Sequence, residues 1–106
     1  MANEPAFTIG IEEEYLLVNQ ETRDLAADPP AKMLAEIEQR LSGQVSSEFL
    51  RAQIEVETKI CRSIPEARED LSHLRRTVAK VANGYGFAPI AAGEIESDLL
   101  ELHVVL

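Results

Sequence analysis

Residues 7–18 read FTIGIEEEYLLV, and this stretch has the pattern of a β-strand. β-Branched and aromatic residues dominate it, and polar or charged residues interrupt them with a partial period of two, as in a half-buried strand. One face carries the apolar set Phe7, Ile9, Ile11, Tyr15 and Leu17. The other face carries Thr8, Gly10, Glu12, Glu14, Leu16 and Val18. Glu13 is the exception, because it falls on the apolar face.

A short helix is predicted after this strand. Residues 19–28 form a polar connection, in which Asn19-Gln20-Glu21-Thr22 is typical of a turn. Asp28-Pro29 resembles an N-cap followed by a proline in the first helical turn. Apolar residues then lie at helical spacing up to Ser42-Gly43, namely Met33, Leu34, Ile37 and Leu41. Residues 45–62 are extended but longer than an average strand, so we expect a bend, a bulge or a leading loop.

The clearest helix covers residues 64–83. Ser63 and Glu66 form an S-x-x-E capping box, Pro65 lies in the first turn, and Gly84 stands where a C-terminal cap belongs. Its predicted apolar stripe is Ile64, Ala67, Leu71, Leu74, Val78 and Val81. We expect the basic residues Arg68, Arg75, Arg76 and Lys80 to face elsewhere. A turn over 84–86 leads to a short apolar strand at 87–92, so the predicted α+β order is β-α-β-α-β.

Composition narrows the class of protein. The 106 residues include 19 Asp and Glu against 10 Lys and Arg, for a net charge of -9. This balance argues against nucleic acid or an anionic membrane surface as the main partner, because both need clustered basic residues. The single cysteine cannot form an internal disulfide, and the N-terminus lacks the basic and apolar regions of a secretory signal. We therefore expect a cytoplasmic protein.

The acidic residues of the first strand suggest a cation site. Glu12 and Glu14 leave the same face of a strand, with Cβ atoms about 6.5 to 7 Å apart. Two such carboxylates repel each other unless a cation or a donor lies between them, and Mg²⁺ prefers oxygen ligands of this kind. Gln53, Glu55 and Glu57 repeat the spacing on the second extended stretch. Alternating glutamates are also typical of the solvated face of an antiparallel sheet, and both interpretations stay open.

Other candidate residues give weaker signals. Glu48 lies seven residues before Glu55, so the two share a face only if a bulge or bend intervenes. Arg51 and Arg62 flank the acidic strand and would either hold a substrate carboxylate or phosphate or pair with the glutamates. We interpret His73 and His103 as solvated surface residues and Cys61 as a small buried residue at a strand end.

Three motifs together resemble a known family. They are GIEEEYLLV, then SEFLRAQIEVET with KICRS, then APIAAG. With this spacing the chain, over about residues 7–93, is similar to the bacterial carboxylate-amine ligases of the glutamate-cysteine ligase type, the second glutamate-cysteine ligase family. The resemblance implies a β-α-β-α-β segment of a glutamine-synthetase-like antiparallel sheet with helices on one face. It also divides the chain into an N-terminal part of a ligase catalytic domain, residues 1–93, and a divergent acidic tail, residues 94–106.

The resemblance also implies a chemistry. In that family, ATP phosphorylates a substrate carboxylate to an acyl phosphate, and an amine attacks it to give an amide or γ-glutamyl bond. Mg²⁺ would then be bound at Glu12, Glu14 and Glu55, with Glu48 as a further acidic position. Arg51, from its place beside the acidic strand, is the candidate contact to substrate. The partners would be an amino-acid carboxylate, an amine and ATP as co-substrate.

The chain departs from the family pattern in places, and alternatives follow. After Gly93 it continues EIESDLLELHVVL, where the family usually has a threonine-histidine-proline run. Members of the family are several times longer, so we expect a segment that does not complete catalysis alone. A small non-catalytic α+β binding or interaction module is the alternative, as is a cation site without nucleotide. Unpaired sheet edges would also favour a homo-oligomer.

Overall fold

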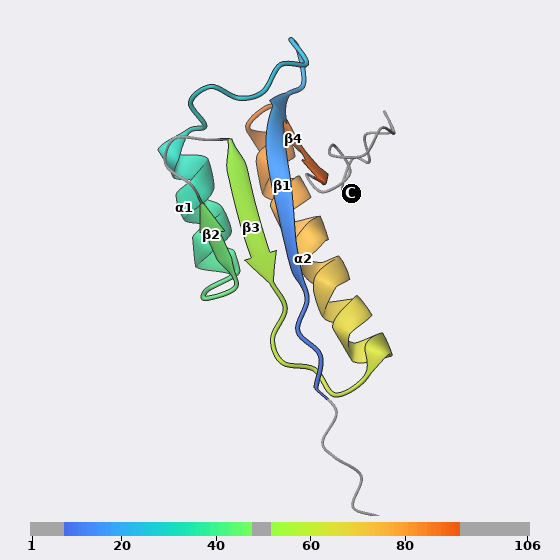
Figure 1. Ribbon diagram of the computed structural model, residues 1–106. Helices are drawn as coiled ribbons and strands as arrows, with labels where there is room; N and C mark the ends of the chain where they lie inside the picture. Colours follow the sequence, from blue (N-terminus) through green and yellow to red (C-terminus); the bar gives the residue numbers. More distant parts are fainter. Residues whose placement is uncertain (1–7, 48–51, 92–106) are drawn as a thin grey trace, which may run out of the picture.

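The computed structural model describes residues 8–47 and 52–91 (Figure 1). In chain order its elements are β1 (Glu12–Asn19), α1 (Ala31–Arg40), β2 (Val45–Ser47), β3 (Gln53–Glu57), α2 (Ile64–Gly84) and β4 (Phe87–Ala91). The described strands form a single sheet in the order β2-β3-β1-β4, and every neighbouring pair is antiparallel.

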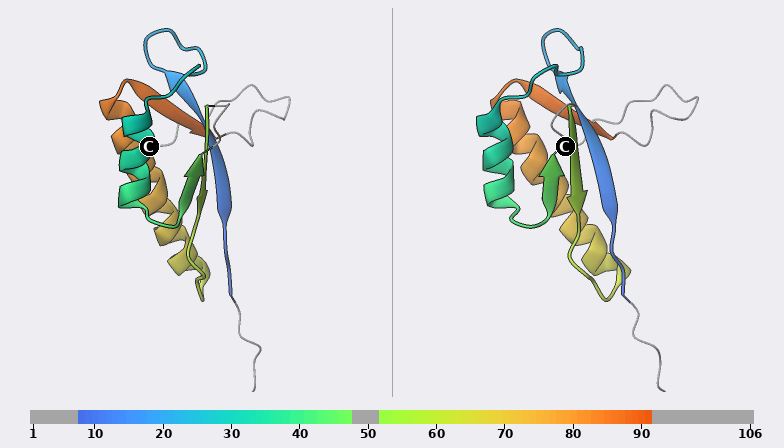
Figure 2. Two further views of the ribbon diagram at one scale, coloured as in Figure 1. Left: turned by 90° about the vertical axis from the view of Figure 1, so that its left-hand side faces the viewer. Right: turned by 60° about the vertical axis from the view of Figure 1, so that its left-hand side comes forward.

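Both helices cover the same face of this sheet (Figure 2). α1 connects β1 to β2, which lie on either side of β3 in the sheet. α2 connects β3 to β4, which lie on either side of β1. Within the described residues the opposite face carries no helix. The predicted α+β class, with an antiparallel sheet and helices on one face, is therefore confirmed. No helix in the described parts of the chain is long and apolar enough to cross a membrane.

The extended stretch over 45–62 contains two strands instead of one. β2 pairs with β3 so that Val45 lies opposite Val56 and Ser47 opposite Ile54. The chain therefore reverses between them, at a connection that includes residues 48–51, outside the described residues. In place of the bend, bulge or leading loop expected within residues 45–62, the chain reverses, and the predicted order β-α-β-α-β becomes β-α-β-β-α-β.

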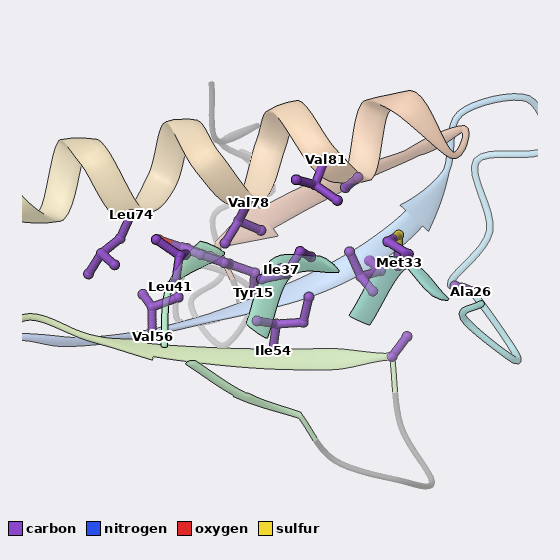
Figure 3. Packing of buried hydrophobic residues seen from close by; sticks show 13 residues of the cluster. Tyr15, Ala26, Met33, Ile37, Leu41, Ile54, Val56, Leu74, Val78 and Val81 are labelled. Atoms are coloured by element: carbon purple, nitrogen blue, oxygen red, sulfur yellow. The ribbon is translucent and has the colours of Figure 1, made fainter. Parts of the chain in front are cut away.

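The core lies between the helices and the helix-facing side of the sheet (Figure 3). Tyr15 and Leu17 of β1 are fully buried, as predicted for the apolar face of the first strand. The strand begins at Glu12 and not at residue 7, so Ile9 and Ile11 precede it and are half-buried, and Phe7 lies outside the described residues. Each buried side chain of this size stabilises the fold by about 1.5–3 kcal/mol through removal of apolar surface from water. The principal contacts come from Ile54 and Val56 of β3, Met33, Ile37 and Leu41 in and just after α1, and Leu74, Val78 and Val81 of α2.

The start of α1 differs from the prediction. The N-cap is Pro30 in an extended conformation, and no side chain caps the helix, so the prediction of Asp28 as N-cap was wrong. The cause is the Pro29-Pro30 pair, because a residue that precedes proline is disfavoured from the helical region. Pro29 therefore cannot form the first helical turn, and the helix begins after both prolines.

The ends of α2 agree with the prediction at the N-terminus and differ at the C-terminus. Ser63 Oγ accepts a hydrogen bond from the Glu66 amide at 3.1 Å, as the capping box predicts. Gly84, predicted as the C-terminal cap, is instead the last helical residue. At this end of the helix the positive φ, 90°, belongs to Gly86. Ile64, which was predicted in the apolar stripe, is 57% exposed.

Candidate metal-binding site

The sheet face opposite the helices carries a group of four glutamates, which we call the carboxylate face. Glu12 lies directly opposite Glu57, and Glu14 lies directly opposite Glu55, across the β1-β3 pair. All four residues are exposed. Opposite residues in an antiparallel pair share a face and have Cβ atoms about 4.5–5.5 Å apart. The structure therefore brings together two pairs of like charges on adjacent strands.

The buried residues between these glutamates fix their direction. Tyr15 on β1 and Val56 on β3 are fully buried on the helix side, so the residues beside them must point away from the helices. The ladder ends at Thr58, which is 5% exposed. Its amide donates to the Ile11 carbonyl at 2.9 Å, and its hydroxyl accepts from the Ile11 amide at 3.0 Å. This double contact holds the register at the glutamate pairs.

The donors of the carboxylate face suit a hard divalent cation, because exposed carboxylates are the oxygen ligands that Mg²⁺ prefers. Within residues 8–47 and 52–91, no group of three or more His, Cys, Asp or Glu side chains is placed so that it could hold a metal ion as the side chains stand. Exposed glutamates can change rotamer without losing buried contacts, so binding of an ion here would depend on rotation of these side chains. The face therefore fits the chemistry of the cation as a set of donors on one surface.

The predicted site residues have different positions. Glu12, Glu14 and Glu55 lie together on the carboxylate face. Glu57 belongs to the same face, although the resemblance assigned it no role. Glu48 and Arg51 lie outside the described residues, as does His103.

Three other residues occupy ordinary structural positions. His73 and Arg62 are exposed. Cys61 is fully buried, as predicted for a small residue at a strand end, and its thiol donates to the Lys59 carbonyl at 3.2 Å. Burial, followed by the charges of Glu66 and Asp70, raises the pKa of this thiol, which disfavours a reactive thiolate.

Glu13 belongs to a polar network that the sequence pattern did not predict. Its Oε1 accepts hydrogen bonds from the Tyr15 hydroxyl at 2.6 Å and from Arg75 Nε at 2.8 Å. Arg75 Nη2 forms a second contact to Glu13 Oε2, so the ion pair is bidentate. Arg75 lies outside the buried core, as predicted, and its guanidinium nevertheless reaches the sheet through this ion pair. The available signal was Glu13 itself, because a carboxylate on an apolar face requires a partner.

This network defines the charge states of its members. Burial by itself raises the pKa of the Glu13 carboxyl, but hydrogen bonds from Arg75 and Tyr15 outweigh it and hold the pKa below its usual value. Burial, and then the neighbouring carboxylate of Glu13, raise the pKa of Tyr15. The hydrogen bond to Glu13 raises the pKa of Arg75. At neutral pH the network therefore consists of a carboxylate, a neutral phenol and a guanidinium.

The fold and the carboxylate face define a class of protein, an α+β domain whose open antiparallel sheet presents acidic side chains on the face without helices. The model of the family described as glutamate-cysteine ligase family 2 matches residues 8–102. The chain therefore belongs to this family, and the resemblance inferred from the sequence motifs is confirmed.

Curated relatives agree with this assignment. The chain is 56% identical over 93 residues to a Rhodospirillum rubrum protein named "Putative glutamate-cysteine ligase 2", covering 84% of this chain and 24% of that protein. It is 59% identical over 85 residues to a protein of the same name from Jannaschia sp., a match that covers 80% of this chain and 22% of that protein. It is 46% identical over 91 residues to the Paracoccus denitrificans protein of that name, a match that covers 86% of this chain and 24% of that protein. The chain thus spans about a quarter of the length of these relatives.

Proposed function

We propose that this chain contributes the Mg²⁺-binding sheet face of an ATP-dependent carboxylate-amine ligase that joins an amino-acid carboxylate to an amine. The observation that carries the proposal is the arrangement of Glu12 opposite Glu57 and Glu14 opposite Glu55 on the face that no described helix covers. Family membership and the names of the relatives support the ligase class.

The proposed chemistry explains why carboxylates are needed here. Formation of an acyl phosphate is a phosphoryl transfer, which depends mainly on positioning and on neutralisation of phosphate charge. Mg²⁺ held by carboxylates supplies that neutralisation, and it keeps coordination sites for phosphate oxygens. Glu12, Glu14 and Glu55 would bind the cation in this scheme, with Glu57 beside them. Glu13 would act through structure alone, because its carboxylate is held on the helix side by Arg75.

Calorimetric titration of the 106-residue chain with millimolar Mg²⁺ tests this assignment. We expect heat of binding for the wild type and its loss in the double variant Glu12→Gln plus Glu14→Gln. The matched control is Glu21→Gln plus Glu38→Gln, because both residues are exposed but lie outside the carboxylate face. The control removes the same charge and should bind like the wild type. Equal loss in both variants, or no loss in either, would refute the assignment.

A second titration separates a nucleotide-dependent site from a simple cation site. The titration is repeated with the Mg²⁺ complex of a non-hydrolysable ATP analogue as titrant, because the triphosphate by itself binds Mg²⁺. We expect the chain to bind this complex more tightly than it binds the free ion, because phosphate oxygens complete the coordination of the ion. Unchanged affinity would support a cation site without nucleotide and contradict the ligase chemistry.

A further inference from the structure

Gln20, directly after β1, holds the turn between α2 and β4 through three hydrogen bonds, which we call the Gln20 clamp. Its side-chain Nε2 donates to Asn83 Oδ1 at 2.8 Å and to the Phe87 carbonyl at 3.2 Å. Its backbone amide donates to the Gly86 carbonyl at 2.9 Å. The clamp therefore ties the end of β1 to the end of α2, although 63 positions of sequence separate Gln20 from Asn83 (Figure 1).

Asn83 is exposed and is followed by Gly84, and this pair of residues has a chemistry of its own. The carboxamide of an asparagine is open to attack by the backbone nitrogen of the next residue, and a glycine there carries no Cβ to hinder the approach. Neither a close contact nor a left-handed conformation requires glycine at position 84. The structural reasons for a glycine are thus absent at this position, and the reactivity of the pair remains.

We propose that Asn83 is a site of spontaneous deamidation and that the Gln20 clamp controls its rate. The Gly84 nitrogen attacks Asn83 Cγ, so a new N–Cγ bond forms and the Cγ–Nδ2 bond breaks. The amide group of the side chain departs as ammonia, with the proton that the Gly84 nitrogen loses. Water then opens the cyclic succinimide at either of its carbonyls, which leaves aspartate or isoaspartate at position 83.

The folded backbone opposes this attack. Asn83 and Gly84 belong to the last turn of α2, and in an α-helix each backbone amide is directed at the carbonyl four residues earlier. The Gly84 nitrogen reaches Asn83 Cγ only when this turn opens. Helix ends open more readily than helix interiors, and the Gln20 clamp holds this end closed through the Asn83 side chain. Loss of the clamp should therefore accelerate the reaction.

The product alters the end of α2. A carboxylate at position 83 places negative charge beside the helix C-terminus, where the helix dipole disfavours it. Isoaspartate also inserts a methylene group into the backbone, which disturbs the hydrogen bond from the Gly86 amide to the Asn83 carbonyl, 3.1 Å long. Deamidation therefore loosens the connection between α2 and β4.

Peptide mapping by mass spectrometry of the 106-residue chain, incubated in mildly alkaline buffer, tests the site. We expect aspartate and isoaspartate to accumulate at Asn83 and not at Asn19, which also lies at a turn but is followed by Gln20. Gly84→Ala should stop the reaction at Asn83, because the added Cβ hinders the nitrogen while it meets no other atom of the fold. Absence of product at Asn83, equal reaction at Asn19, or reaction that persists in Gly84→Ala would overturn the proposal.

Two glutamine variants test the clamp. Gln20→Ala should raise the rate at Asn83 about two- to tenfold, the factor by which an opening equilibrium changes when the net contribution of a hydrogen bond is lost. Gln39→Ala removes the same side chain at an exposed position of α1 and should leave the rate unchanged. In concentrated urea the wild type and both variants should react at one common rate, faster than the folded wild type, because only the folded chain has the clamp. Equal rates for folded Gln20→Ala and folded wild type, or a difference that persists in urea, would contradict control by the clamp.

Discussion

Removal of the Glu13 carboxylate should destabilise the fold through Tyr15 more than through Arg75. Tyr15 is fully buried, so Glu13→Ala leaves its hydroxyl without an acceptor, at a cost of about 1–3 kcal/mol. The Arg75 side chain is 42% exposed, so loss of its ion pair costs only about 0–1 kcal/mol. Together these effects give an expected decrease of about 1–4 kcal/mol in the free energy of unfolding.

A double-mutant cycle separates the two contributions. Tyr15→Phe removes the hydroxyl and leaves Glu13 paired with Arg75, so by itself it should cost about 1 kcal/mol. In that background Glu13→Ala leaves no buried hydroxyl unsatisfied, and its cost should fall to about 1 kcal/mol. The measurement is urea denaturation followed by circular dichroism, with m-values compared between variants. Glu38→Ala, at an exposed position on α1, is the control and should change stability by less than about 0.5 kcal/mol.

Two results would contradict this reasoning. If Glu13→Ala costs the same in the wild-type chain and in the Tyr15→Phe background, the hydrogen bond between Tyr15 and Glu13 is not the source of the effect. If it is as mild as Glu38→Ala, neither the hydroxyl nor the guanidinium depends on the carboxylate.

Three further predictions concern pH, a turn and the carboxylate face. The pKa of Glu13 in the folded state lies below its unfolded value of about 4.3. The stabilisation that the Glu13 carboxylate provides is therefore complete above that pH and is lost as the pH falls through the folded-state pKa. The difference in stability between the wild type and Glu13→Gln, measured from urea midpoints at a series of acidic pH values, should shrink below about pH 4. Gly86→Ala should lower the free energy of unfolding by about 1 kcal/mol or more, because a φ of 90° is strained for alanine even though no atom lies within 4 Å of the added Cβ. Gly84→Ala, in the last turn of α2, is the control and should not destabilise the fold, and thermal melts compare the two variants. Glu55→Gln should raise the free energy of unfolding by less than about 1 kcal/mol at low salt by relieving repulsion with Glu14, and the gain should fade at high salt.

The sequence predicted those parts of the fold that depend on local periodicity. The alternation around Tyr15 and Leu17 identified the buried face of β1, and the Ser63–Glu66 spacing located the start of α2. In each case the determining interactions lie within a few residues, or within one strand face, so they are visible in the order of residues alone.

Features that depend on distant pairing could not be predicted in this way. Arg75 reaches Glu13 across 62 positions of sequence, and periodicity alone gave no reason to separate it from the other basic residues of α2. The reversal between β2 and β3 has no Gly, Pro or Asn-Gly signal in residues 45–57, so the stretch resembled one bent strand. The partner strand of each glutamate likewise depends on the sheet order, which the sequence does not state.

The β1-β3 register bears on the two interpretations that the sequence left open for the alternating glutamates. A merely solvated sheet face gains stability when acidic residues lie opposite basic ones, whereas Glu12 opposite Glu57 and Glu14 opposite Glu55 place like charges together twice. Among the described residues, the two ion pairs are Arg40–Glu36 and Arg75–Glu13, and neither includes a residue of the carboxylate face. The repulsion is therefore not offset by the described part of the chain. A divalent cation would offset it directly, and this unbalanced repulsion is the ground on which we propose a binding site at the carboxylate face.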